Sequence, residues 1–293
     1  VPLLEKWLFT YVDPSYRNFV SADDYTNRRF VSIVGTYDGM LHFFRIGKLT
    51  ETGDTWAPVR LEDHEYGKEE YAIIPENALP YMLWYGKADY CPVPIIDYRT
   101  QVIDLPLTGG SNSPLSANSW GTYLIGVMGL GGKRLEGTNF SSSVFMYDLT
   151  DYLRDPNQRP RLVFETRLSN YELTTSFPVV VRQLTDTSSP EKNGKFYLVL
   201  GSGPLDPYAD SPDKFTDNPR LYVIRLSDSI DTSFKQFNLN NLPGLPGTQR
   251  RFAVGDLVVL DLDNVNRYDV IYFGVYGFYN QGANWKWFGG LYR

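Results

Sequence analysis

Short apolar runs of strand length recur along the whole chain and constrain its fold more than any other feature. Each run is rich in β-branched and aromatic residues and ends at Gly, Pro, Asn or Asp, which is typical of strands joined by turns. Only 75–87 and 148–155 have the pattern of short helices. We therefore predict an all-β fold. The runs lie at 28–35, 40–46, 69–75, 93–98, 122–129, 143–149, 161–166, 177–182, 195–201, 220–226, 255–262, 270–274 and 287–293.

The number and order of the runs limit the all-β architectures that are possible. No βαβ alternation is visible, so a sandwich, a barrel or a propeller remains, and 22 Tyr, 17 Phe, 25 Gly and 19 Pro suit many short strands. At roughly 40 to 50 residues per blade the chain is long enough for about six or seven propeller blades, but the runs fill only three or four. A propeller would be incomplete or carry long insertions. The polar stretches 47–68, 107–119, 184–194 and 204–218 are the expected insertions.

No linker divides the chain, so we predict one domain over 1–293, with 1–27 as a lead-in segment. The opening residues, VPLLEKWLFTYVDP, lack the basic start and the cleavage site of a signal peptide. We expect a processed form or a fragment whose export signal is not in this sequence. No run approaches the roughly 18 apolar residues of a membrane span.

Charge and cysteine content exclude several classes of function. The net charge of −6 gives no basic footprint for nucleic acid. Cys91 is the single cysteine, which excludes an internal disulfide and a zinc cluster built on thiolates. His42 and His64 are the only histidines, and no G-x-S-x-G elbow accompanies them. We expect His42, in the alternating run MLHFF, to satisfy a backbone group inside the fold, and His64 to be solvated.

The segment DLDNVNRYD, at 261–269, has the acidic spacing of a calcium loop. Calcium takes several oxygen ligands, which a tight loop supplies from alternating side chains and a backbone carbonyl. Acidic side chains occupy the first, third and ninth positions, and the seventh residue would offer its carbonyl. The fifth position holds a valine, which can offer only its own carbonyl. The candidate ligands are Asp261, Asp263, Val265, Arg267 and Asp269.

The surroundings of this segment leave two interpretations open. Asn266, at the sixth position, is among the few residues other than Gly that tolerate a positive φ. Tyr272 stands where an EF-hand has its last glutamate, so a strand–turn–strand setting is expected. The alternative to a metal site is an Asp/Asn-rich turn whose side chains cap local backbone amides.

Other motifs give weaker signals. GVMGLGGK, at 126–133, fails the phosphate-loop pattern at Val127 and Arg134, so we predict a turn between strands. Asn139 begins an N-x-S triplet, which fits a glycosylation sequon, but such triplets arise often by chance. The 34 acidic residues leave a glycosidase-like carboxylate pair open, although nothing points to one. Four tryptophans would either form a binding surface for glycans or protein, or pack between blades: Trp56, Trp84, Trp120 and Trp285.

Segments taken in chain order resemble motifs of one family. VGTYDGMLHFF (34–44) is similar to "vGaNDGMLHaF", and WGTYLIGVMGLGGK (120–133) to "WrtvLvgglG.GGr", both of the PilY/PilC proteins, the tip-located adhesins and biogenesis factors of bacterial type IV pili. The closing DLDNVNRYDVIYFGVYG (261–277) resembles "D.D.dG..D.vY.Gd..G". The resemblance covers nearly all of 28–293. Further matches are EEYAIIPENALPYMLW (69–84), PIIDYRTQVIDL (94–105), MYDLTD (146–151), RLVFE (161–165), TTSFPVVVR (174–182) and FYLVLGSG (196–203).

The resemblance implies a modified β-propeller of the quinoprotein type, without the adhesive N-terminal domain of the family. It implies a non-enzymatic, extracellular protein at the pilus tip or cell surface, which supports pilus assembly on minor pilins and adhesion to a host or surface receptor. It also implies a regulatory calcium loop that affects pilus extension and retraction, from whose pattern Val265 departs. Two alternatives stay open. They are a quinoprotein-like dehydrogenase, for which no tryptophan-docking repeat is visible, and a glycan-binding lectin-type propeller.

Overall fold

The computed structural model describes residues 13–62, 66–89, 91, 94–108, 115–183, 195–227, 234–247, 249–262 and 270–293. Antiparallel strands dominate this part of the chain. The strands are β1 (Val31–Gly35), β2 (Leu41–Arg45), β3 (Lys48–Glu51), β4 (Val59–Glu62), β5 (Glu69–Ile73), β6 (Gln101–Leu105), β7 (Gly121–Val127), β8 (Ser143–Asp148), β9 (Arg161–Arg167), β10 (Val179–Gln183), β11 (Lys195–Gly201), β12 (Arg220–Leu226), β13 (Phe234–Asn238), β14 (Arg250–Leu260), β15 (Val270–Gln281) and β16 (Asn284–Tyr292).

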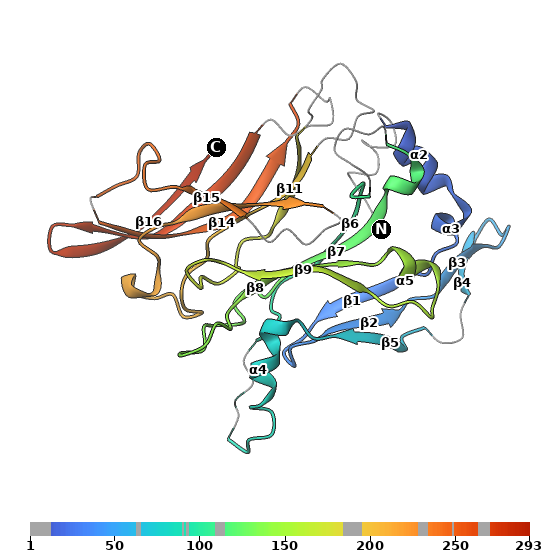
Figure 1. The fold of residues 1–293 in the computed structure, drawn as a ribbon, viewed down its shortest axis with the longest axis horizontal. Helices are drawn as coiled ribbons and strands as arrows, with labels where there is room; N and C mark the ends of the chain where they lie inside the picture. The colour runs from blue at the N-terminus through green and yellow to red at the C-terminus, as the bar shows by residue number, and fades with distance from the viewer. Residues whose placement is uncertain are drawn as a thin grey trace.

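The strands form four larger sheets whose order follows the chain. They are β1-β2-β5, β6-β7-β8-β9, β10-β11-β12-β13 and β14-β15-β16, and β3 and β4 pair as a separate ribbon. This up-and-down order within three- and four-stranded sheets is that of propeller blades. The first sheet and the last lie on opposite sides of the two middle sheets (Figure 1). The predicted all-β class is therefore confirmed.

Helices are short and few among the described residues. Helices were expected at 75–87 and 148–155, and both are confirmed, whereas the two helices in the lead-in segment were not predicted. The helices are α2 (Pro14–Ser21), α3 (Asp23–Thr26), η1 (Glu76–Ala78), α4 (Leu79–Met82), η2 (Ala117–Ser119), α5 (Thr150–Arg154) and η3 (Pro212–Lys214). Within the described ranges, none is long and apolar enough to cross a membrane.

The predicted strand at 93–98 is wrong over its described part, residues 94–98, which bend instead of extending. Pro94 lacks an N–H for a strand ladder. Ile95 and Ile96 are apolar because they are buried in a loop that packs against the core. Strands β3, β4, β6 and β13 were not predicted, and β3 and β4 lie within the stretch 47–68 that was expected to be an insertion.

Three clusters of buried side chains join the sheets in pairs. The first cluster joins α2 and α3 to the two middle sheets, the second joins the first two sheets, and the third joins the last two. Strand β7 is buried along its whole length because successive side chains enter different clusters. Tyr123, Ile125 and Val127 belong to the first cluster, and Leu124 belongs to the second.

Local sequence explains why the lead-in segment is helical. The side chain of Asp13 accepts a hydrogen bond from the backbone N–H of Ser15 at 2.9 Å, which caps α2, and Pro14 occupies the first helical position. Tyr16 and Phe19 then face the core, where their ring centroids lie 4.5 Å and 6.4 Å from that of Trp120. The Trp120 Nε1–H donates to Ser15 Oγ at 2.9 Å. The segment is thus fixed to the second sheet by packing and by this hydrogen bond.

Candidate functional site

The predicted calcium segment connects the two long strands of the last sheet. Leu260, at the end of β14, pairs with Val270, at the start of β15, so the strands bring the ends of the segment together. Tyr272 lies within β15, so strands flank the segment on both sides, as expected. A register shift between Val254 and Leu257 bends β14 before it reaches the loop.

Most of the predicted ligand set lies outside the described residues. Asp261 is described, and it follows β14 directly as a half-buried side chain. The ligand set therefore remains a prediction. Within the described ranges, no group of three or more His, Cys, Asp or Glu side chains is placed to hold a metal ion. The candidates that fall outside those ranges are Asp263, Val265, Arg267 and Asp269.

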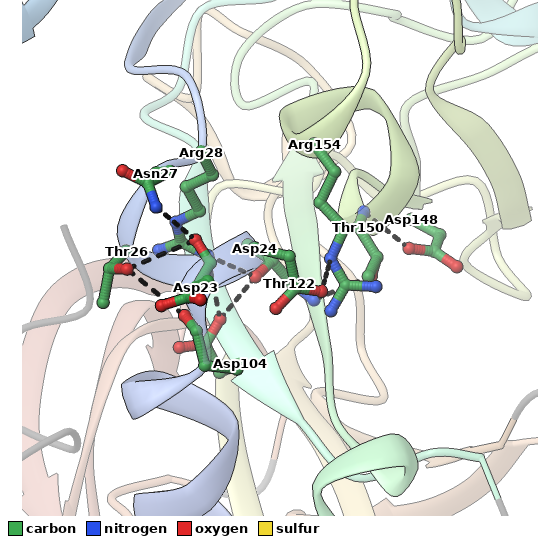
Figure 2. Close-up of polar contacts among 11 residues, drawn as sticks. Asp23, Asp24, Thr26, Asn27, Arg28, Asp104, Thr122, Asp148, Thr150 and Arg154 are labelled. Carbon is green, nitrogen blue, oxygen red and sulfur yellow. Dashed lines mark hydrogen bonds and ion pairs between the residues drawn. The ribbon is translucent and has the colours of Figure 1, made fainter.

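A buried carboxylate in β6 forms the centre of a polar cluster. Asp104 is 5% exposed. Its Oδ2 accepts hydrogen bonds from the hydroxyls of Tyr16 and Tyr25, both at 2.8 Å, and its Oδ1 accepts one from Thr122 Oγ1 at 2.6 Å. Arg28 Nη1 lies 3.8 Å from Oδ1 and donates to Thr122 Oγ1 at 2.8 Å (Figure 2).

This arrangement stabilises the carboxylate and the hydroxyls around it. Burial and the charge of Asp104 raise the pKa of both Tyr16 and Tyr25 well above the ordinary tyrosine value. The two tyrosines therefore stay protonated and act as donors. A general base needs an oxygen directed at a substrate, whereas both oxygens of Asp104 accept hydrogen bonds from the protein. The cluster thus links α2 and α3 to the second sheet through hydrogen bonds.

Further polar contacts connect α3 to α5. Arg154 Nε lies 2.9 Å from Asp24 Oδ2. The backbone N–H of Thr122 donates to Thr150 Oγ1 at 2.9 Å, and the N–H of Thr150 donates to Asp148 Oδ1 at 2.9 Å. Figure 2 shows the side chains of Asp24, Thr122, Asp148, Thr150 and Arg154 that make these contacts. Only the presence of a charged residue in the apolar run QVIDL signalled such a site in the sequence.

His42 contacts carboxylates, which corrects the prediction that it satisfies a backbone group. Its Nε2 lies 2.9 Å from Asp38 Oδ2, and its Nδ1 lies 2.8 Å from Glu69 Oε1. Burial lowers the pKa of His42, but the hydrogen bonds and charges of Glu69 and Asp38 outweigh this and hold the pKa above its usual value. The histidine joins the turn before β2 to the edge of β5. His64 lies outside the described residues.

The other motifs have structural roles. The glycine-rich segment 126–133 contains the end of β7 and the turn after it, as predicted, and Gly129 and Gly132 have φ values of 69° and 73°. Asn139 Oδ1 accepts a hydrogen bond from the Tyr171 hydroxyl at 3.2 Å. Cys91 is exposed.

The four tryptophans divide between the two expected roles. Trp120 is buried in the first cluster, and Trp84 packs at the edge of the second, 5.5 Å from Tyr81. Trp56 is 95% exposed between β3 and β4. Trp285, at the start of β16, lines a polar cavity of about 460 Å³. The expectation of a tryptophan at a binding surface thus has a concrete candidate in Trp285.

Two comparisons agree with the predicted resemblance. The chain is 26% identical over 218 residues to a protein of Xylella fastidiosa described as a type IV pilus biogenesis factor PilY1 homolog, a match that covers 71% of this chain and 13% of that protein. The fold of this chain is similar to the crystal structure of the Pseudomonas aeruginosa PilY1 C-terminal domain, with a TM-score of 0.53 and 21% identity. The match covers 92% of this chain and 42% of that one. No family model matches the chain.

These matches confirm the resemblance to PilY/PilC-type proteins that the motifs indicated. Because the sequence identity to the solved structure is low, the structural match supports the fold alone. The chain spans 13% of the length of the first of these two proteins and 42% of the second. It therefore corresponds to one part of a much larger relative.

Proposed function

We propose that this chain is a non-enzymatic domain of a type IV pilus biogenesis protein, located at the pilus tip or cell surface. It would support pilus assembly by contacting minor pilins and would contribute to adhesion to a host or surface receptor. The observation that carries the proposal is the combined match in sequence and fold to PilY1-type proteins over most of the chain. The carboxylate and histidine clusters agree with it, because Asp104 and His42 are held by protein groups and not directed toward a substrate.

The test of this role is made in the source bacterium with the full-length gene. We expect deletion of the gene to reduce the number of surface pili, and complementation with the wild-type gene to restore it. The purified domain should also bind at least one minor pilin in a direct binding assay. Normal piliation in the deletion strain would contradict the proposal.

We further propose that the loop after β14 holds calcium. Asp261, Asp263 and Asp269 would supply carboxylates, and Val265 and Arg267 would supply backbone carbonyls. The pairing of Leu260 with Val270 supports this, because it closes the loop at its base without help from the metal. Bound calcium would offset the repulsion among the three carboxylates.

Calorimetric titration of metal-stripped protein with calcium tests the loop. We expect saturable heat in the wild type, and loss of that heat in the double variant Asp261→Ala/Asp269→Ala. The matched control Asp89→Ala/Asp213→Ala removes two exposed aspartates elsewhere and should bind as the wild type does. A flat trace for the wild type at millimolar calcium would mean that the segment is an Asp/Asn-rich turn. That result would leave the pilus role standing.

A further inference from the structure

The polar cavity beside Trp285 lies at the end of the last sheet opposite the predicted calcium loop. The start of β14 and the start of β16 form one side, because Trp285 follows the β15–β16 turn and Gln249 precedes β14. Asn240 and Asn241, which follow β13, and Asp217 form the other side. The cavity is about 460 Å³, within the range of sites for small molecules. Its lining residues are Asp217, Asn240, Asn241, Gln249, Arg250, Arg251 and Trp285.

One arginine links several backbone carbonyls of the cavity wall. Each side-chain nitrogen of Arg250 donates to backbone carbonyls: Nε to Gly247 at 3.0 Å and Pro246 at 3.2 Å, Nη2 to Leu245 at 3.3 Å, and Nη1 to Asn240. These bonds fix the loop between β13 and β14. The wall is thus formed before any ligand arrives, which lowers the entropy cost of binding.

The amide of Asn240 is oriented by its neighbours. Its Nδ2 donates to Asn218 Oδ1 at 2.9 Å, and its backbone N–H donates to Asn238 Oδ1 at 2.8 Å. Its Oδ1 is buried and accepts no hydrogen bond from the described residues. This oxygen is shielded from solvent, so it lies behind the cavity surface, and Asn240 is a fixed part of the wall.

The hydrogen bonding of the two arginines, which outnumber the single aspartate in the lining, argues against an anionic ligand. The guanidinium of Arg250 is directed at the backbone, so it offers no paired N–H groups to a phosphate or carboxylate. Arg251 donates from Nη1 to the carbonyl of Pro212 at 3.3 Å, and its Cζ lies 5.9 Å from the ring centroid of Trp285. Asp217 is exposed and would repel a second negative charge. A single carboxylate is also too few for a dedicated calcium or magnesium site.

We propose that this cavity binds a neutral saccharide. An indole beside two side-chain amides and one carboxylate matches the chemistry of a sugar ring, which has an apolar C–H face and hydroxyls that both donate and accept hydrogen bonds. Trp285 would contact the ring face. Asn241 and Gln249 would hydrogen-bond the hydroxyls, and Asp217 would accept from one of them. This site is independent of the pilus role and of the calcium loop.

The test uses the purified wild-type chain and a glycan array of neutral and acidic oligosaccharides, followed by calorimetric titration of the neutral hexoses and N-acetylhexosamines that bind. We expect binding to neutral glycans. Trp285→Ala should weaken it at least about tenfold, and Asn241→Ala, at an exposed position, about threefold or more. The matched control Trp56→Ala removes a fully exposed tryptophan far from the cavity and should leave affinity unchanged.

Each other outcome would overturn the proposal. These are no binding by the wild type at millimolar sugar, binding that survives both Trp285→Ala and Asn241→Ala, and binding restricted to acidic glycans. Circular dichroism identifies a variant that fails to fold, and Asn241→Ala then decides the result. The variant Asp261→Ala/Asp269→Ala should keep its sugar affinity, so failure of the calcium proposal does not affect this test.

Discussion

Asp104 shows how a charged side chain can be buried without a metal or a catalytic role. Removing a carboxylate from water is costly unless hydrogen bonds and a counter-charge replace the solvent. Here three hydroxyls donate to it and Arg28 lies nearby. Two of the hydroxyls come from the helical segment before the first sheet, so the carboxylate couples that segment to β6.

Replacing this carboxylate should therefore loosen the segment it holds. We expect Asp104→Asn to lower the free energy of unfolding by about 2 to 4 kcal/mol, because the amide presents N–H groups to donors and leaves Arg28 without its nearest charge. Urea unfolding followed by circular dichroism measures the change. The exposed Asp89→Asn should change stability by less than about 0.5 kcal/mol. Equal stability of the two variants would contradict the assigned role.

His42 gives the fold a pH dependence of definite sign. Because its pKa is raised in the folded state, its contribution is fully present below the unfolded value of about 6.5 and is lost as pH rises through the folded pKa. The pKa of Asp38 is lowered: although burial would raise it, hydrogen bonds from Thr36, Met40 and His42 outweigh that effect. The contribution of Asp38 is therefore lost only at more acidic pH.

The measurable quantity is the difference in unfolding free energy between the wild type and His42→Gln. We expect it to be largest below the unfolded value of about pH 6.5, and to shrink toward zero as the pH rises through the raised pKa of the folded state. Its maximum should be no more than about 1 kcal/mol, since Glu69 and Asp38 are partly exposed and water screens the pairs. A difference that does not vary with pH would show that the ring acts only by packing.

At the scale of elements, the turn after β7 depends on glycine for space. Gly131 passes so close to the loop at Ile95 that an added Cβ would lie 1.9 Å from the Ile95 carbonyl oxygen. The loop cannot move away easily, because Ile95 is fully buried and Asp97 N donates to the carbonyl of Met128 at 3.1 Å. The glycine-rich segment that superficially resembles a phosphate loop is thus required by packing.

A single methyl group tests that conclusion. We expect Gly131→Ala to destabilise the protein by about 3 kcal/mol, because backbone must shift to accept the Cβ. Gly86→Ala is the matched control, since open space surrounds Gly86, and it should change stability by less than about 0.5 kcal/mol. Chemical denaturation of the two variants gives the comparison. A neutral Gly131→Ala would mean that the loop at Ile95 is free to move.

Sequence pattern was sufficient for elements in which one physical effect dominates. Strands β11 and β12 begin and end where their alternating apolar runs do. The run at 93–98 failed because buried loop residues and strand residues are equally apolar. Strands β3 and β4 were missed because their side chains are largely polar. The sequence predicted Asp261 in a hairpin loop, but it contains no local sign that Tyr16 and Tyr25 meet Asp104, because that contact joins residues distant in the chain.

At the scale of the molecule, the two middle sheets are the structural centre. Successive residues of β7 enter two different clusters, and those of β11 do the same, with Leu198 and Leu200 in the first cluster and Val199 in the third. Each middle sheet is therefore buried on both faces. Neighbouring sheets share their cores, which should make unfolding cooperative across all four sheets.

A core substitution between the first two sheets tests this cooperativity. Leu124 is fully buried in the cluster that joins them, so Leu124→Ala should lower the free energy of unfolding by about 2 to 5 kcal/mol. If the sheets unfold together, tryptophan fluorescence and far-UV circular dichroism will report one shifted transition with the same midpoint. The control Leu162→Ala, on β9 of the same sheet but 44% exposed, should cost less than about 1 kcal/mol. Separate midpoints for the two probes in Leu124→Ala would instead mean that the first sheet unfolds independently, and that the blade-like sheets are coupled more weakly than their shared cores imply.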